Sequence, residues 1–281
     1  MSARRASAGF TLIELMIAVT IGLVLTLVIG QVFLGSRFAY TSNDALSRVQ
    51  ENARYALTLL SREVRQSTFK SDPRQARATV FPIATTASLA AIDGAALASG
   101  TATTPDIITV RFQGSGNGAG SPDGTVQDCT GTRIDYGAMV VNTLFIQNDP
   151  TNNNEPTLFC FTGAPPANAA PACNANPLPA NCFALIPGVE NMQMLFGEDT
   201  GFGTLNPDGA IDRWVTATNV SNWDNVLGVR IALLLRTDDR VGQQVDTRTY
   251  LMSGTNVPAP GNDMRQRRVF TTVINLRNRV T

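Results

Sequence analysis

The chain has 281 residues, and its 22 basic side chains balance 22 acidic ones, so the formal net charge is zero. This balance excludes the strong basic excess of a general nucleic-acid-binding protein. The chain contains no histidine, which excludes Ser-His and Cys-His nucleophile pairs and mixed Cys/His zinc sites. The composition therefore predicts neither catalysis nor direct nucleic-acid binding.

The first predicted element is an apolar helix over residues 10–34, in which Glu14 is the one charged residue. Such a helix would be about 37 Å long, enough to cross the hydrocarbon core of a bilayer. Arg4 and Arg5 precede it, and the positive-inside tendency places that end in the cytoplasm. The remainder of the chain is therefore predicted to be exported across the membrane.

The segment before this helix, residues 1–9, is short and basic and has no apolar stretch of its own. A secretory signal carries its apolar region before the cleavage site, so the order is reversed here. Cleavage after Gly9 would leave the helix on the mature chain and create a new amino group on Phe10. An acid in hydrocarbon costs about 3 kcal/mol and usually has a pairing role, so Glu14 is expected to have a cationic partner.

The basic leader, Gly9 and the sequence Phe-Thr-Leu-Ile-Glu-Leu that follows resemble the class III signal of type IV prepilins and type II secretion pseudopilins. The resemblance implies cleavage between Gly9 and Phe10 by a prepilin peptidase, N-methylation of Phe10, and a subunit-docking role for Glu14. The ammonium of Phe10 in one subunit would neutralise Glu14 of its neighbour. An ordinary signal anchor with an acid near its end is the alternative.

The helix is predicted to continue to about Thr68, because apolar residues recur at three- and four-residue steps and no proline occurs before Pro73. The recurring residues are Leu46, Val49, Ala53, Ala56, Leu57, Leu60 and Val64. The expected organisation is a leader peptide (1–9), a transmembrane or filament-core half of the helix (10–34), an amphipathic half (35–68) and a periplasmic, β-rich globular head (69–281).

After the helix, residues 72–105 are predicted to form a loop with a short helix around 87–91. Strand signals follow, as apolar runs rich in β-branched and aromatic residues between turn residues. They cover 107–112, 139–146, 157–161, 186–197, 226–237 and 267–279. A long helix followed by antiparallel strands predicts an α+β fold in which a sheet with long loops packs on the helix.

The four cysteines lie in the middle of the chain, at Cys129, Cys160, Cys173 and Cys182. Their spacing does not match the paired C-x2-C pattern of a structural zinc site, and export of this segment favours disulfides. Three pairings are possible. We favour Cys129 with Cys160 and Cys173 with Cys182, and buried free thiols are the alternative.

A polar cluster that invites a metal ion surrounds Gly-rich turns: Glu198, Asp199, Asn206, Asp208 and Asp212. Calcium uses oxygen ligands on loops of this kind, but the spacing does not satisfy the EF-hand pattern. A solvated turn is the favoured interpretation. No cofactor is therefore predicted, and a Ca²⁺ site at Asp199, Asn206, Asp208 and Asp212 is the alternative.

Three of the predicted strands, 186–197, 226–237 and 267–279, resemble in this order the strands of PilW-type minor pilins. Together with the helix after the membrane segment, the resemblance covers roughly half of the chain. It implies a type IV pilin-like fold and a non-catalytic minor pilin of the type IV pilus. Such a protein acts in a tip or initiation complex that supports twitching motility, adhesion or DNA uptake.

The partners that this resemblance implies are a prepilin peptidase, other minor pilins, the major pilin, a tip adhesin and the membrane. The implied location is the bacterial inner membrane, with a cytoplasmic N-terminus and a periplasmic head, and then the pilus or cell surface. Two alternatives stay open. One is a J-type minor pseudopilin of type II secretion, and the other is a single-span envelope enzyme or adhesin that acts alone.

Overall fold

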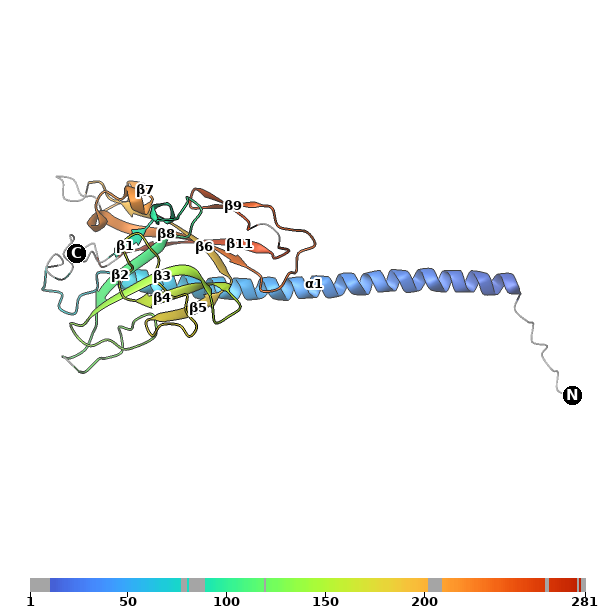
Figure 1. Ribbon diagram of the computed structural model, residues 1–281, viewed down its shortest axis with the longest axis horizontal. Coiled ribbons are helices and arrows are strands. Elements are labelled where there is room, and N and C mark those ends of the chain that lie inside the picture. Colours follow the sequence, from blue (N-terminus) through green and yellow to red (C-terminus); the bar gives the residue numbers. More distant parts are fainter. Residues whose placement is uncertain are drawn as a thin grey trace. The chain divides into compact units, whose positions relative to one another are not determined.

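The computed structural model describes residues 11–76, 80, 89–118, 120–201, 209–260, 263–276 and 278. The chain divides into two compact units, Met1–Ala45 and Leu46–Thr281. Helix α1 (Leu12–Gln66) begins in the first unit and ends in the second (Figure 1). Its bounds lie close to those predicted from the sequence.

The second half of α1 buries the apolar stripe that its sequence predicts. Val49, Ala53, Ala56, Leu60 and Val64 are at most 3% exposed and belong to the main hydrophobic core. Spacings of three and four residues bring these side chains to one face of the helix. The predicted stripe is therefore confirmed as a packing surface.

Helix α1 ends where the backbone turns at Thr68, whose φ is 69°. The Thr68 N–H donates to the carbonyl oxygen of Arg111, at 3.1 Å, instead of continuing the helical pattern. Since a positive φ is uncommon in a β-branched residue, tertiary contact with the neighbouring strand, rather than local preference, stops the helix here.

The strands form two sheets and a hairpin rather than the single sheet expected (Figure 1). The first sheet has the order β1-β2-β3-β4-β5, and all neighbours are antiparallel. Its strands are β1 (Leu89–Ile92), β2 (Ile107–Gln113), β3 (Met139–Asp149), β4 (Glu155–Thr162) and β5 (Cys182–Pro187).

The second sheet has the order β11-β8-β6-β7, again antiparallel, with the hairpin β9-β10 beside it. Its strands are β6 (Val189–Glu198), β7 (Arg213–Val215), β8 (Val226–Arg236) and β11 (Arg267–Asn275), and the hairpin comprises β9 (Thr249–Met252) and β10 (Thr255–Pro258). Short 3-10 turns lie at Gly94–Ala96, Ala217–Asn219 and Trp223–Asn225.

Strand β8 is central because both of its faces are buried. Val229, Ile231 and Leu233 face the main core shared with α1 and the first sheet. Ala232 and Leu234 face a smaller core formed with the β9-β10 hairpin. Burial on both sides explains why this segment reads as a continuous apolar run instead of an alternating one.

The predicted short helix around 87–91 is wrong for the part that the structure describes. Residues 89–92 form strand β1, which pairs with β2 so that Leu89 lies opposite Val110 and Ile92 opposite Ile107. Leu89 is fully buried. Its burial against the sheet outweighs the helix propensity of the neighbouring alanines, which is a small effect per residue.

The predicted strand 186–197 divides at Gly188, where the chain passes from β5 to β6 and so from one sheet to the other. The φ of Gly188 is 80°, a conformation that favours glycine. Its N–H donates to Pro156 O at 2.8 Å, and its carbonyl accepts from Arg236 N at 2.9 Å. Gly188 is therefore hydrogen-bonded to both sheets.

Candidate functional site

The first turn of α1 is closed by a reciprocal cap between Thr11 and Glu14. The Thr11 N–H and hydroxyl each donate to Glu14 Oε2 at 3.0 Å, and the Glu14 N–H donates to Thr11 Oγ1 at 3.3 Å. This is a capping box, and loss of such a cap costs about 1 kcal/mol. The Thr-x-x-Glu spacing is the sequence signature of this cap, which was not among the predicted features.

The cap gives Glu14 a local partner within its own helix. Its predicted role in subunit docking stays a prediction, because the structure contains one chain. Gly9 and Phe10, the predicted cleavage site, lie outside the described residues.

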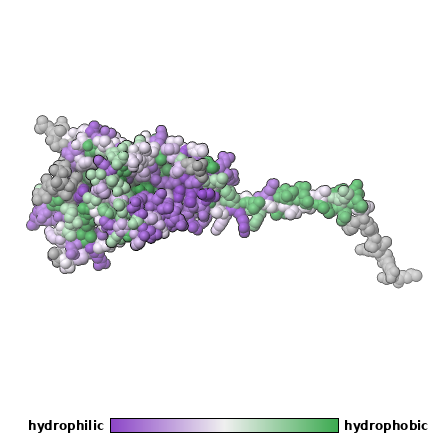
Figure 2. Space-filling view, in the orientation of Figure 1, coloured by the Kyte–Doolittle hydropathy of each residue, from purple (hydrophilic) through white to green (hydrophobic). Residues whose placement is uncertain are grey.

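The first half of α1 exposes a long apolar surface. Its large apolar side chains are all exposed, from Leu12 at 77% to Leu34 at 68%, and Figure 2 shows this stretch in hydrophobic colours. No residue between Glu14 and Arg37 is charged. Among the described residues, α1 is the one helix long and apolar enough to cross a membrane. Water is an unfavourable environment for a surface of this kind.

The acidic residues proposed as calcium ligands point to separate partners. Glu198 is fully buried and accepts from Ser221 N at 2.7 Å, and Arg213 approaches it at 2.8 Å. Asp212 accepts from Thr200, whose hydroxyl lowers the pKa of Asp212. The sequence predicts a solvated turn here. The structure instead shows Glu198 as a buried, ion-paired group.

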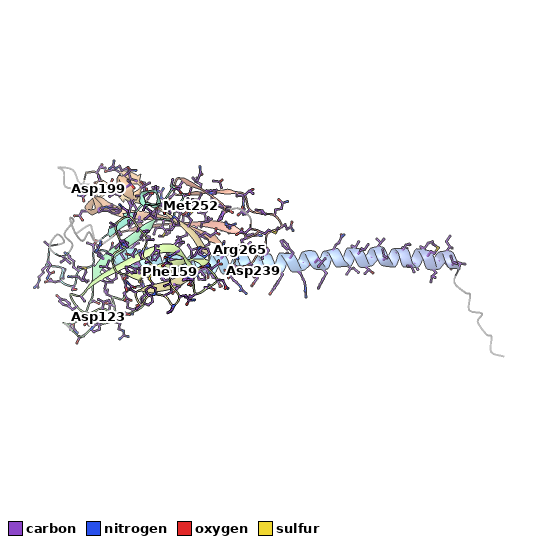
Figure 3. The ribbon with its side chains drawn as sticks, viewed as in Figure 1. Asp123, Phe159, Asp199, Asp239, Met252 and Arg265 are labelled. Carbon is purple, nitrogen blue, oxygen red and sulfur yellow. A yellow bond between two sulfur atoms is a disulfide. The ribbon has the colours of Figure 1, made fainter. Side chains whose placement is uncertain are left out.

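Asp199 is the remaining described member of this cluster (Figure 3). It is fully buried, and its Oδ1 accepts from Gly201 N at 2.9 Å, while Oδ2 has no hydrogen-bond partner among the described residues. Asn206 and Asp208 lie outside the described residues. Within the described part of the chain, no group of three or more acidic, histidine or cysteine residues is arranged to hold a metal ion.

The cysteines form the two favoured pairs. Cys129 is bonded to Cys160, with Cα atoms 6.4 Å apart, and Cys173 is bonded to Cys182, with Cα atoms 5.6 Å apart. The first bond ties the loop before β3 to strand β4 in the main core. The second closes a short loop onto the start of β5, beside the core formed by Phe145 and Phe159.

Sequence reasoning missed a buried cluster of ion pairs at one end of the second sheet. Arg267 and Arg236 lie directly opposite each other on β11 and β8, and Glu190 contacts both, at 2.6 Å from Arg267 Nε and 3.2 Å from Arg236 Nη1. Asp263 and Asp246 complete the contacts of Arg267. No spacing rule joins these residues, because the sheet register brings them together.

Another buried acid, Asp106, is held by hydrogen bonds from the backbone. Its two carboxylate oxygens accept from Gly94 N at 2.8 Å and from Met194 N at 2.7 Å. Burial raises the pKa of Asp106 to about 7, although these hydrogen bonds lower it. Because both oxygens are engaged in joining the β1-β2 connection to β6, the arrangement is that of a structural link.

Comparisons with known proteins bear on both ends of the chain. Residues 143–278 match the family described as type IV pilus-assembly protein W (PilW), and residues 4–30 match the prokaryotic N-terminal methylation motif. A type IV-like pilin from Thermus thermophilus is similar at 15% identity, with a TM-score of 0.41, over 82% of this chain and 97% of that chain. The comparison with curated proteins gives no match.

The methylation motif, the exposed apolar half of α1 and the antiparallel sheets that follow define a type IV pilin-like protein. The class has a structural role. Within this class, the region from β3 to just beyond β11 matches the PilW family. The resemblance stated from the sequence is confirmed.

Proposed function

We propose that the chain is a minor pilin that acts without catalysis in assembly of the type IV pilus, in a tip or initiation complex. The observation that carries this proposal is the capped, exposed apolar half of α1, most of which lies within the region that matches the methylation motif, residues 4–30. This surface can be covered by lipid before assembly and by the helices of neighbouring subunits afterwards. The energy for growth would come from other components, and this chain would contribute geometry.

The proposal assigns a function to each segment. Residues 1–9 would be the leader removed by a prepilin peptidase, 10–34 the membrane and filament-core segment, 35–68 the amphipathic half, and 69–281 the periplasmic head. The precursor would lie in the inner membrane with its N-terminus in the cytoplasm, and the mature chain would reach the pilus or cell surface. Its partners would be other minor pilins, the major pilin and a tip adhesin.

In the filament, Glu14 would neutralise the methylated amino group of Phe10 from a neighbouring subunit. A buried acid without a counter-charge is costly, and a paired one in low dielectric is strongly attracted to its partner. The Thr11 cap uses Glu14 Oε2 and supports a fixed position of the carboxylate at the helix start. The pair would thereby set the axial register between subunits.

The decisive experiment on processing is mass spectrometry of the N-terminus of the protein recovered from cells. We expect a chain that begins at methylated Phe10. A mature protein that keeps Met1, or one that is cut after residue 34, would contradict the proposal, because the apolar helix would then not enter a filament in the proposed form.

The docking role of Glu14 predicts that Glu14→Val blocks pilus assembly while the protein still inserts and folds. Because valine also removes the cap, Glu14→Gln is the informative companion, since glutamine retains capping ability but not the charge. Both variants should lack pili by electron microscopy, and Gln31→Val should assemble normally. Normal piliation in Glu14→Gln would assign the residue to capping alone.

A further inference from the structure

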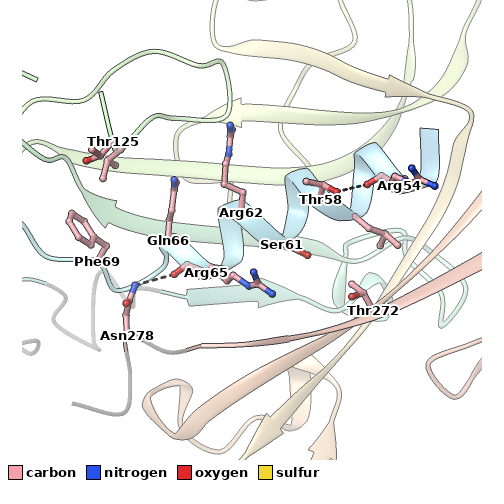
Figure 4. Close-up of a pocket in the computed structure, with 12 residues that line it drawn as sticks. Arg54, Thr58, Ser61, Arg62, Arg65, Gln66, Phe69, Thr125, Thr272 and Asn278 are labelled. Carbon is pink, nitrogen blue, oxygen red and sulfur yellow. Dashed lines mark hydrogen bonds between the residues drawn. The ribbon is translucent and has the colours of Figure 1, made fainter. Parts of the chain in front are cut away.

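A groove of about 910 Å³ lies within the unit Leu46–Thr281, along the second half of α1 (Figure 4). Leu57, Phe69 and Val126 give it an apolar lining. Thr125 stands on one side of the helix and Thr272 of β11 on the other, as Figure 4 shows. The groove is therefore bounded by the edge of the second sheet.

The groove carries positive charge that the described residues leave uncompensated. Arg54 and Arg65 line it, and neither side chain has an acidic partner within 4 Å in the described part of the chain. Arg62, also in the lining, is paired with the buried Glu63 at 2.9 Å. An occupant of this groove should therefore carry carboxylates as well as apolar side chains.

The backbone of β11 indicates a second property of the occupant, which is an extended backbone that can pair with a sheet edge. Thr237 N donates to Gln266 O, and Leu276 N donates to Leu227 O. These bonds fix the antiparallel alternation, in which every second residue faces β8 and those between face away. Backbone groups of the intervening residues accordingly point to the open edge of the sheet. These are Val269, Thr271, Val273 and Asn275, for which no edge partner is seen among the described residues.

We propose that this groove and edge form a docking site for an extended polypeptide segment of a partner protein that carries both apolar and acidic side chains on the face turned to α1, two residues apart along its strand. The segment would add to β11 as a further strand through the open backbone groups. Its apolar side chains would lie toward Leu57 and Phe69, and its carboxylates would reach Arg54 and Arg65.

An acidic partner fits this site better than a second copy of the chain. Strand β11 itself contains no acidic residue, and its sequence begins with two arginines. Edge-to-edge pairing of two copies would bring two positively charged grooves together, which is repulsive. The site goes beyond the proposed role of α1 and involves neither Gly9 nor Glu14, so its failure and that of the proposed function can be told apart.

The test is binding of synthetic peptides to the full chain in detergent micelles, measured by fluorescence anisotropy. The probe is a labelled nine-residue peptide, matched to the length of β11, with valine at positions 1, 5 and 9, glutamate at positions 3 and 7, and threonine at the others, so that valine and glutamate share one face of the strand. The control peptide has glutamine at every glutamate. We expect the acidic peptide to bind and the neutral peptide to bind about tenfold more weakly.

Two test variants, each with a control, separate the contribution of the arginine charges from that of the backbone groups at the edge of β11. Arg54→Glu combined with Arg65→Glu should weaken binding of the acidic peptide by about tenfold or more, whereas Arg240→Glu, an exposed arginine outside the groove, should not. Val273→Pro should abolish binding because proline has no N–H to donate at the edge. Val273→Thr keeps that N–H and should bind normally.

Three outcomes would overturn the proposal. They are equal binding of acidic and neutral peptides, unchanged binding by Val273→Pro, and self-association of the chain that Val273→Pro removes. The last would assign the edge to a second copy. Circular dichroism of each variant establishes that the loss of binding is not a loss of folding, because the Val273 N–H faces away from β8.

Discussion

At the scale of single residues, Arg267 shows how buried charge is made tolerable. Its side chain is fully buried, and it lies opposite Arg236 in the β11-β8 ladder, where like charges are destabilising. Glu190 Oε1 accepts from both guanidinium groups, at 2.9 and 3.2 Å. The neighbouring carboxylates outweigh burial and raise the pKa of Arg267, so it stays charged.

Removing this arginine is expected to be costly. Arg267→Met would remove the cation that Glu190, Asp263 and the buried Asp246 share, and Arg236 would remain beside only the first two. We expect a loss of about 3 kcal/mol in the free energy of unfolding. Chemical denaturation of the full chain in micelles measures this change in the free energy of unfolding. Arg268→Met, at the exposed neighbouring position, is the matched control and should change stability by about 0.5 kcal/mol or less. Equal stability of the two variants would contradict this account.

The same cluster predicts a pH dependence. Burial raises the pKa of Asp246, but hydrogen bonds from Arg248 and Tyr250 outweigh it and hold the pKa below the ordinary aspartate value of 3.8. Arg267 likewise outweighs burial at Asp263 and lowers its pKa. Because both values are depressed in the folded chain, the stabilisation is present above pH 3.8 and is lost as the pH falls through the folded-state values.

Denaturation at a series of pH values checks whether stability falls as the pH is lowered. The free-energy difference between the natural chain and Asp246→Asn should be largest near neutral pH and should shrink as the pH falls below about 4. A difference that stays constant over this range would show that Asp246 does not act through its charge.

At the scale of elements, the two disulfides close loops of different length, with sequence separations of 31 and 9 residues. Loop-closure entropy predicts that they contribute about 3.7 and about 2.6 kcal/mol respectively. Replacing Cys129 and Cys160 by serine should therefore lower the melting temperature more than replacing Cys173 and Cys182. The reverse order would indicate that strain or residual structure decides the effect.

The elements that sequence predicts well are those with a strong local pattern. Helix α1 and strand β8 are found almost at their expected bounds, because a long periodic or continuous apolar run has few other solutions. Strand β1 was missed because its identity comes from pairing with β2. The break at Gly188 was missed because a single glycine in a strand pattern does not reveal a change of sheet.

The features of the candidate site can likewise be separated into those with a local sequence pattern and those that depend on strand pairing. The capping box of Thr11 and Glu14 is local and could be read from the sequence. The cluster around Arg267 joins residues from β6, β11 and two loops, and the groove beside β11 joins residues from both ends of the chain. Contacts between such distant positions depend on the sheet register, which no local pattern contains.

At the scale of the whole molecule, one chain combines a surface suited to lipid with a unit that has its own core. We expect the full chain to remain with membranes after alkaline carbonate treatment and to need detergent for release. Leu23→Arg places a charge near the middle of the apolar stretch and should disfavour insertion by about 3 kcal/mol, which increases the extractable fraction. Leu23→Ala should remain in the membrane. Extraction of the natural chain by carbonate would contradict a spanning helix.

The junction at Gly188 has a further consequence for how the unit Leu46–Thr281 responds to heat or to pulling. This residue donates a hydrogen bond to Pro156 in β4 and accepts one from Arg236 in β8, and it is the single residue between the end of β5 and the start of β6. Tension on either sheet is passed to the other without an intervening linker. The two sheets should therefore melt in one cooperative step, and the unit should resist force as a single body.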